Sequence, residues 1–224
     1  MTDETGPFVV TRLEVAEPRG TVLFAVGAGG NPERHLPLLS ALSDRGFTVV
    51  APHFERITPA SVTADDLLLR VRRLRQALDI VAPPDAAVVG VGHSIGATML
   101  VALAGGQVWM GPGHRLSIDR DERLVKLALL TPTTGFFQAP GALDDVRVRI
   151  LAWAGAKDTI TPPAHAELLK RALKDRAPVE VRIEQDAGHF SFMHVPPPSV
   201  IESLADRDEF LARLTAEVIK FAEA

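Results

Sequence analysis

A serine between closely spaced glycines is the feature of the sequence best suited to chemistry. Ser94 lies in the segment Gly92-His93-Ser94-Ile95-Gly96, after the apolar, β-branched residues 88–91 and before a run of small and apolar residues. This order predicts a strand, a very sharp turn and a helix, with the serine hydroxyl raised out of the backbone. Side chains at Gly92 or Gly96 would collide with the neighbouring strand and helix. We interpret Ser94 as a nucleophile, and the alternative is a serine that only forms a turn.

The ends of other predicted strands supply the groups that such a nucleophile needs. Residues 21–26 are followed by the loop Gly27-Ala28-Gly29-Gly30, residues 148–154 by Asp158, and residues 179–184 by His189. In an open parallel sheet, ligands bind beyond the carboxyl ends of the strands, so we expect these segments to converge. Ser94, His189 and Asp158 are therefore the candidate nucleophile, base and acid.

The sequence resembles the α/β-hydrolase superfamily from about residue 21 to the last predicted helix. The chain order Ser94, Asp158, His189 is that of the superfamily's catalytic triad. The segment around Ser94, with Ala154-Gly155-Ala156-Lys157-Asp158 and Ala187-Gly188-His189-Phe190-Ser191-Phe192, is most similar to the small esterases grouped with dienelactone hydrolases and platelet-activating-factor acetylhydrolases. The resemblance implies serine-dependent ester hydrolysis on an eight-strand-type sheet.

Two features depart from that family. Dienelactone hydrolase proper uses a cysteine nucleophile, and this chain contains no cysteine. The family's usual His-Gly before the oxyanion loop is Val26-Gly27 here. The second departure matters only if it moves the loop, because losing one oxyanion donor typically costs about 10²- to 10³-fold in turnover.

The chemistry of acyl transfer assigns a role to each group. His189 removes the proton of the Ser94 hydroxyl during attack, since imidazole accepts protons near neutral pH. Asp158 holds the ring in the required tautomer and stabilises the imidazolium. The backbone N–H groups of Ala28 and Ile95 are the predicted oxyanion donors. The alternatives are a plain loop histidine for His189, helix capping for Asp158, and another acid in its place: Asp144, Asp145 or Asp186.

A competing motif overlaps the serine segment. Residues 90–96 read G-x-G-x-x-x-G, one residue longer than the dinucleotide fingerprint. That fingerprint also belongs in the first βα turn and needs an acidic strand end, whereas Asp119 lies in a loop-like segment. The loop of residues 27–30 lacks the Gly-Lys-Ser/Thr of a phosphate-binding loop. We therefore expect no nucleotide, metal or other cofactor.

We predict structural rather than catalytic or binding roles for the other histidines and for a group of arginines. His93 is expected to pack beside the turn rather than to act in catalysis. The remaining histidines are interpreted as loop or surface residues: His35, His53, His114, His165 and His194. Four arginines on the helix that follows Thr63 are interpreted as a solvated face rather than a polyanion site: Arg70, Arg72, Arg73 and Arg75.

Apolar strands alternating with helices predict an α/β fold, with a mostly parallel twisted sheet covered by helices on both faces. Thr63 with Asp66 marks one helix start, and Thr161 is the predicted N-cap of another. Strands are expected at residues 8–15 (an edge), 21–26, 47–51, 87–91, 125–130, 148–154 and 179–184, and helices at 32–42, 63–78, 95–104, 162–174 and 208–222. With no linker or repeat, residues 1–224 are predicted to form a single domain.

The segment between two of these strands limits the size of any lid. Residues 131–146 are too few for a helical cap domain, so we expect a fairly open site and no large cap. Aromatic residues on nearby loops are candidates for pocket walls, with core packing as the alternative for each: Phe136, Phe137, Phe190 and Phe192, with Met193. No basic cluster points to an anionic substrate, which favours a short-to-medium acyl ester.

Composition excludes several other classes. The 224 residues are 46% hydrophobic and 23% charged, as in ordinary globular proteins, and the net charge of −4 gives no general reason to bind nucleic acid. The acidic N-terminal residues do not form a signal peptide, and the longest apolar run is too short to span a bilayer. We expect a cytoplasmic protein without membrane insertion, acting on a small-molecule ester. The sequence does not predict its oligomeric state.

Two further functions fit the same pattern. An acyltransferase, thioesterase or perhydrolase would form the same acyl-enzyme on Ser94 and pass it to an acceptor other than water, or take it from a donor other than an oxygen ester. A binding protein could keep the fold and the triad without catalysis, and the altered Val26-Gly27 favours this slightly.

Overall fold

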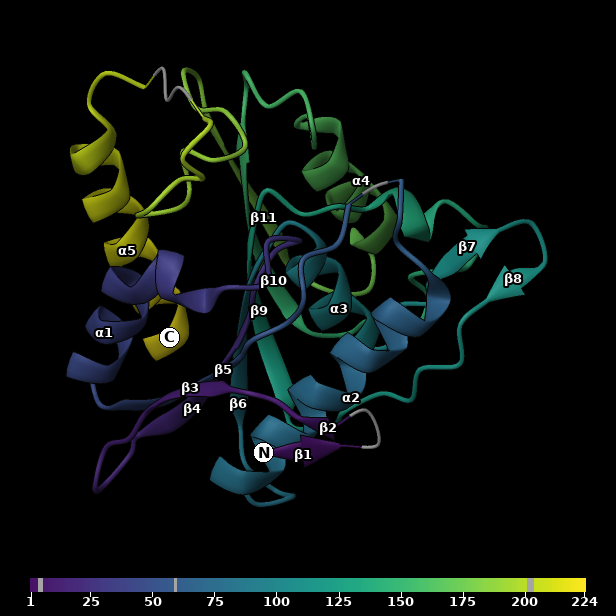
Figure 1. Ribbon diagram of the computed structural model, residues 1–224. Helices are drawn as coiled ribbons and strands as arrows, with labels where there is room; N and C mark the ends of the chain where they lie inside the picture. Colours follow the sequence, from purple (N-terminus) through teal and green to yellow (C-terminus); the bar gives the residue numbers. More distant parts are fainter. Residues whose placement is uncertain (4–5, 59, 201–203) are drawn as a thin grey trace.

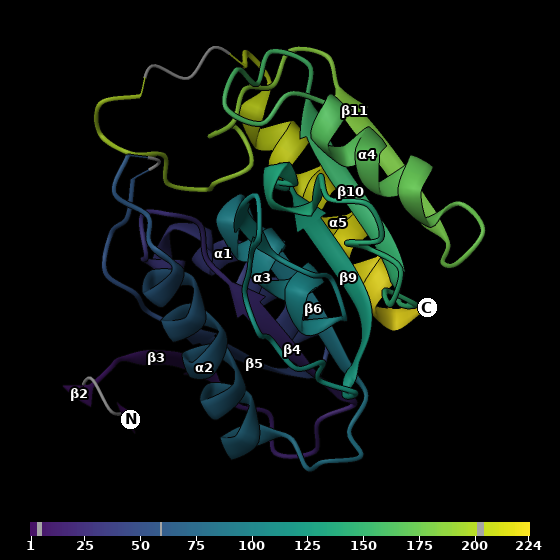
Figure 2. The same cartoon turned by 90° about the vertical axis from the view of Figure 1, so that its right-hand side faces the viewer.

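A seven-stranded sheet forms the centre of the structure, a computed structural model that describes residues 1–3, 6–58, 60–200 and 204–224. Its strands follow the order β11-β10-β9-β6-β4-β5-β3, and all neighbours are parallel except β3, which pairs antiparallel with β5 at one edge (Figure 2). The bounds are β3 Val10–Leu13, β4 Gly20–Ala25, β5 Phe47–Pro52, β6 Val88–His93, β9 Leu124–Leu130, β10 Arg149–Gly155 and β11 Val179–Glu184.

Helices cover both faces of this sheet. Figure 1 shows α1 and α5 on one side and α2, α3 and α4 on the other. Their bounds are α1 Leu36–Asp44, α2 Ala64–Val81, α3 Ile95–Leu103, α4 Ala164–Leu173 and α5 Arg207–Glu223. The mostly parallel sheet between two helical layers confirms the α/β class predicted from the alternation of strands and helices.

The central strands bring their carboxyl ends to one edge of the sheet. β6 is buried at every residue, which explains its continuous apolar sequence. In its register, Gly92 lies opposite Ala25 of β4, and His93 lies opposite Leu130 of β9. The segments that follow these three strands therefore start side by side.

Several short elements have no counterpart in the sequence-based prediction. They are too short to show a period of two or of 3.6 residues. These elements are β1 Thr2–Asp3 paired with β2 Gly6–Pro7, β7 Trp109–Gly111 paired with β8 His114–Arg115, and the 3₁₀ turn η2 Gly135–Phe137. The helix predicted at 32–42 begins as the 3₁₀ turn η1 Pro32–His35 and continues as α1. The eight-strand-type sheet implied by the resemblance has seven strands in the described part of the chain, because β1 and β2 form a separate ribbon.

The helix α2 confirms its predicted start and corrects its predicted face. Thr63 and Asp66 form a capping box. However, Arg70 and Arg73 are buried, and their guanidinium groups lie over the rings of Phe54 and Phe8. The prediction of a solvated face was wrong for these two arginines, because they lie on the side of α2 that faces the protein and are covered by aromatic rings. Arg72 is exposed and Arg75 is half-buried.

No large cap covers the sheet between β9 and β10. All residues of this connection are described, and η2 is the element that they contain. This confirms the expectation drawn from its length. In the described part of the chain, none of the helices combines the length and apolar character needed to cross a bilayer.

Replacement of Gly96 tests how closely α3 approaches the sheet. A Cβ atom at Gly96 would lie 2.0 Å from the carbonyl oxygen of Ala25, which belongs to β4. Because backbone cannot move aside as a flexible side chain can, we expect Gly96→Ala to lower the free energy of unfolding by about 3 kcal/mol, measured by urea denaturation. Gly135→Ala is the matched control, since no atom lies within 4 Å of its added Cβ. Equal stability of the two variants would contradict the close approach.

Candidate active site

Ser94 sits in the sharp turn predicted between β6 and α3. Its backbone adopts φ 55° and ψ −123°, a conformation that serine rarely adopts. The two flanking glycines fit the turn, because a Cβ at Gly92 would lie 2.9 Å from the amide nitrogen of Ala97 and one at Gly96 would strike Ala25. The Ser94 amide donates to the carbonyl of Leu130 at 2.9 Å, which fixes the turn to β9. Strain of this kind is concentrated at functional sites.

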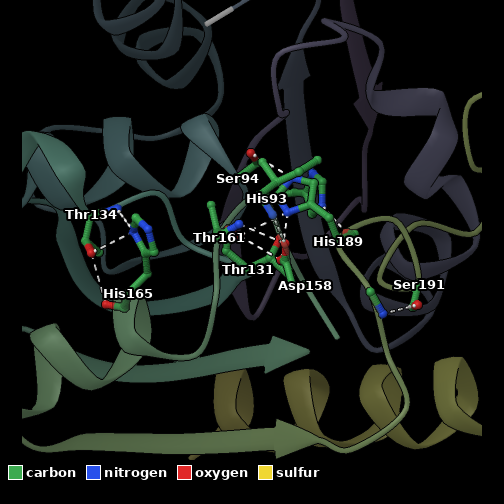
Figure 3. Close-up of polar contacts among 11 residues, drawn as sticks. His93, Ser94, Thr131, Thr134, Asp158, Thr161, His165, His189 and Ser191 are labelled. Atoms are coloured by element: carbon green, nitrogen blue, oxygen red, sulfur yellow. Dashed lines mark hydrogen bonds and ion pairs between the residues drawn. The ribbon is translucent and has the colours of Figure 1, made fainter. Parts of the chain in front are cut away.

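Ser94, His189 and Asp158 form one hydrogen-bonded chain (Figure 3). His189 Nε2 is 3.0 Å from Ser94 Oγ, and His189 Nδ1 is 2.8 Å from Asp158 Oδ2. The residues are 7%, 7% and 3% exposed for Ser94, His189 and Asp158. An ionised carboxylate can only accept, so the Nδ1 proton of His189 points to Asp158 and Nε2 is left to accept from the serine hydroxyl. The three residues singled out from separate strand ends therefore meet.

Close backbone contact brings the loops of Asp158 and His189 together. A Cβ at Gly155 would lie 2.3 Å from the carbonyl oxygen of Ala187, which leaves room only for glycine at the end of β10. The Lys157 amide donates to the same carbonyl at 3.0 Å. The repeated small residues in both segments thus allow the acid and the imidazole to approach each other.

The Asp158 carboxylate is held from several sides. Its Oδ1 accepts the backbone N–H groups of Ile160 and Thr161, each at 2.8 Å. Burial raises the pKa of Asp158, but the hydrogen bond and the charge of His189, together with the bonds from Thr161, outweigh it and lower the pKa overall. The carboxylate is therefore ionised at neutral pH. The rival acids form other ion pairs or face solvent: Asp186 pairs with Lys157, Asp144 pairs with Arg176, and Asp145 is exposed.

Thr161 belongs to the site and was missed by sequence reasoning. The sequence predicted it as a helix N-cap, but Pro163 holds that position in α4. The Thr161 hydroxyl instead lies 2.8 Å from Asp158 Oδ2, 3.0 Å from His189 Nδ1 and 3.2 Å from the carbonyl of Thr131. A threonine shortly before a helix is typical of an N-cap, which led to the wrong prediction. Its spacing three residues after Asp158 was the signal for an Asp-centred turn.

Three histidine rings pack in a row beside the serine turn, each tilted relative to the next. The His35 and His93 centroids are 5.2 Å apart, and those of His93 and His189 are 5.0 Å apart. His93 packs beside the turn as predicted, and its Nε2–H donates to the carbonyl of His189 at 3.2 Å. His35 is fully buried, so its prediction as a loop or surface residue was wrong. It lies between Phe24 and His93, because η1 turns it inward.

Burial controls the charge of the two inner rings. It lowers the pKa of His93 to about 3, with a further decrease from nearby His189, and it lowers the pKa of His35 well below 6.5. Both rings are neutral at neutral pH. Within the described residues, no three side chains of the metal-ligating kinds are grouped so that they could hold an ion.

The other histidines take different places. His165 is half-buried, and its Nδ1 accepts the amide hydrogen of Thr134 at 2.9 Å, so it is tied to the loop after β9. His53 and His194 are half-buried, whereas His114 is exposed. His53 Nε2 lies 2.8 Å from Thr11 Oγ1 at the sheet edge. His53 and His194 lie in loops and His114 is exposed, as predicted. The prediction was wrong for His165, because it lies in helix α4 and turns toward Thr134.

The glycine loop after β4 lies against the serine turn. Gly30 donates to the carbonyl of Gly27 at 3.1 Å, which closes a turn with Ala28 at its first central position. A Cβ at Gly27 would lie 2.8 Å from His93 Nδ1 and 3.4 Å from Ser94 Cβ. Ile95 is the first residue of α3, where amide groups have no acceptor within the helix. The two predicted donors, Ala28 and Ile95, thus belong to adjacent segments.

The predicted aromatic walls divide into two kinds. Phe192 is fully buried against Phe210 of α5, and Phe137 is buried in the core beside α3, so both fill the core rather than line a site. Their prediction as pocket residues was wrong, because sequence proximity to the site does not show which way a ring points. Phe136 and Phe190 are half-buried, and the Phe190 ring lies edge-on to His189 with centroids 5.2 Å apart.

Comparison with known proteins reveals similarity in structure alone. No family model and no curated protein matches the sequence. A propionate-bound esterase from the Planctomycetes species Thermogutta terrifontis covers 98% of this chain and 90% of its own, at 17% identity and TM-score 0.68. The chain has the α/β-hydrolase fold.

Two further structures with the α/β-hydrolase fold match over similar lengths. A predicted CIB-like hydrolase from Thermoplasma acidophilum covers 94% of this chain and 91% of its own, at 17% identity and TM-score 0.61. A monoacylglycerol lipase from Paleococcus ferrophilus covers 96% and 99%, at 13% identity and TM-score 0.64. The Thermogutta esterase has also been solved with butyrate bound and phosphoramylated by tabun.

Because His35 and His93 are buried and neutral, we expect the free energy of unfolding to fall at acidic pH. His35 binds a proton in the unfolded chain near pH 6.5 but not in the folded one, so stability is present above pH 6.5 and is lost as the pH falls below it. Each such histidine contributes a slope of about 1.4 kcal/mol per pH unit. We expect His35→Leu to reduce the slope of the free energy of unfolding between pH 4.5 and 6 by about this amount. Urea denaturation over that range measures it.

Exposed His114 provides the control for this measurement. His114→Leu should leave the slope at its wild-type value. A wild-type slope in His35→Leu would show that His35 is protonated in the folded protein.

Proposed function

We propose that the protein is a serine hydrolase that cleaves a carboxylic ester through an acyl-enzyme on Ser94. The observation that carries this proposal is the buried chain from Ser94 Oγ to His189 Nε2 at 3.0 Å and from His189 Nδ1 to Asp158 Oδ2 at 2.8 Å, at a strained turn. A nucleophile, a base and an orienting acid within hydrogen-bond reach form the arrangement that acyl transfer requires.

The first half of the reaction forms the acyl-enzyme. Ser94 Oγ attacks the ester carbonyl while His189 Nε2 accepts the hydroxyl proton. Negative charge then develops on the former carbonyl oxygen, and the N–H groups of Ala28 and Ile95 donate to it. The imidazolium returns its proton to the leaving alcohol as the carbon–oxygen bond breaks.

The second half releases the acid. Water attacks the acyl group with His189 Nε2 as base, and Ser94 is restored when the tetrahedral intermediate collapses. Asp158 stabilises the imidazolium in both halves, since its pKa is lowered and it stays ionised. Thr161 and the amides on Asp158 hold the carboxylate in place.

The substrate class follows from the surroundings of Ser94. The described connection between β9 and β10 forms no large cap, and half-buried Phe136 and Phe190 are the aromatic candidates left for a pocket wall. The Thermogutta esterase binds propionate and butyrate, which supports a short-to-medium acyl group here. We propose a small-molecule ester as substrate, turned over by one domain spanning residues 1–224 without a cofactor.

Replacement of Ser94 tests the nucleophile. We expect Ser94→Ala to lower kcat for p-nitrophenyl butyrate by about 10⁶-fold, because the acyl-enzyme can no longer form. The wild type should gain one fluorophosphonate adduct by intact mass, and the variant none. Ser117→Ala changes an exposed serine and should match the wild type. Full turnover by Ser94→Ala would refute the proposal.

Replacement of Asp158 tests the acid. Asp158→Asn keeps the size of the side chain but loses its charge, which disfavours the tautomer with the Nδ1 proton, so kcat should fall by about 10⁴-fold. Asp186→Asn is the control, since Asp186 pairs with Lys157 at the surface. A comparable loss of kcat in Asp186→Asn, or no loss of kcat in Asp158→Asn, would show that Asp158 is not the acid.

A further inference from the structure

Arg70 holds a buried cation directly behind the glycine loop. The residue is 2% exposed, although it lies on a helix whose sequence looks solvated. Its Nη1 donates to the carbonyls of Val26 and Gly27 at 3.3 and 3.2 Å, and its Nη2 donates to the carbonyl of Glu55 at 3.2 Å. The guanidinium therefore contacts the two residues that immediately precede Ala28.

The burial of this group is costly for stability alone. Burial lowers the pKa of Arg70 to about 10, partly offset by the charge of Asp66, so the guanidinium remains charged at neutral pH. Its hydrogen bonds go to neutral carbonyls rather than to a carboxylate. An apolar side chain of similar volume at such a place is often as stable or more so. The charge at this position is therefore better explained by a function than by stability.

The hydrogen bond to Gly27 acts on the amide that donates to the substrate. The Gly27 carbonyl and the Ala28 N–H belong to one planar peptide group and point in opposite directions across it. A cation that donates to this carbonyl fixes the plane of the peptide. It also polarises the peptide, which makes the Ala28 N–H a stronger donor.

A second segment completes the support of the loop. The Ile57 amide donates to the Ala28 carbonyl at 3.0 Å, and the Phe54 amide donates to the Gly30 carbonyl at 2.9 Å. Arg70 links this segment to the loop, since its guanidinium also lies 4.6 Å from the centroid of the Phe54 ring. The loop is thus held on both sides of Ala28, and Arg70 joins the two supports.

We propose that Arg70 is a positioning residue for ester hydrolysis, holding and polarising the Gly27–Ala28 peptide so that the Ala28 N–H meets the oxyanion. This inference rests on the proposed function. It assigns Arg70 an effect that appears only as charge develops on the substrate. Loss of Arg70 should therefore reduce kcat and leave KM nearly unchanged.

The test compares three variants for folding by circular dichroism and urea denaturation, and for kcat and KM with p-nitrophenyl butyrate. Arg70→Met removes the charge and the donors, and kcat should fall by about 10- to 100-fold, as expected when an oxyanion donor is displaced. Arg70→Lys keeps the charge but not the forked donors, so its kcat should lie between those of the wild type and Arg70→Met. Arg73→Met is the matched control on the same helix, because Arg73 is buried over the Phe8 ring. It should keep kcat, whatever its effect on the free energy of unfolding.

A second measurement separates positioning from folding. A trifluoromethyl ketone forms a tetrahedral oxyanion with Ser94. Its inhibition constant should therefore rise in Arg70→Met by the same factor by which kcat falls. If Arg70→Met does not fold, Arg70→Lys is compared with Arg73→Met by the same measurements.

Each outcome separates this inference from the proposed function. Unchanged kcat in Arg70→Met, or a loss no greater than in Arg73→Met, would overturn the role of Arg70 while leaving the esterase intact. A rise in KM with constant kcat would overturn it as well. A wild type with neither turnover nor fluorophosphonate adduct would overturn both.

Discussion

The backbone of Ser94 is the constraint on which the rest of the site depends. Its dihedrals of φ 55° and ψ −123° cost about 1–3 kcal/mol and must be stabilised by the surroundings. The buried strand β6, the bond from the Ser94 amide to Leu130 and the close approach of Gly96 to β4 provide that support. The same packing raises the hydroxyl toward His189 and starts α3 at Ile95, so one turn positions both the proposed nucleophile and a proposed oxyanion donor.

The architecture could be predicted because the central strands are buried on both faces. Residues 88–93 and 124–130 are nearly continuous apolar runs, and their order with the helices leads to a parallel sheet. The three residues Ser94, Asp158 and His189 could be found for a related reason. Each follows a strand end next to glycine or other small residues, and parallel strands deliver such ends to one edge. The short ribbons and the 3₁₀ turn η2 carry no periodic pattern and were missed.

Most of the errors concern side chains whose partners are distant in sequence. Arg70 looks like any arginine on an amphipathic helix, because its acceptors lie on the loop after β4 and on the segment after β5. His35 and Phe192 lie close to loops, yet tertiary packing turns both inward. Thr161 has the sequence position of a helix N-cap, but its hydroxyl instead contacts the carboxylate of Asp158 and the imidazole of His189. The loop that follows Val26 is contacted from α2, because Arg70 donates to the carbonyls of Val26 and Gly27.

Capture of the covalent intermediate shows whether Ser94 is the nucleophile. The wild-type protein, quenched in acid during turnover of p-nitrophenyl butyrate, would be digested and its peptides weighed. We expect one butyryl group on the peptide that contains Ser94, with fragmentation assigning it to that residue. A butyryl group on another residue, or turnover with no acylated peptide from substrate excess through to exhaustion, would contradict this expectation.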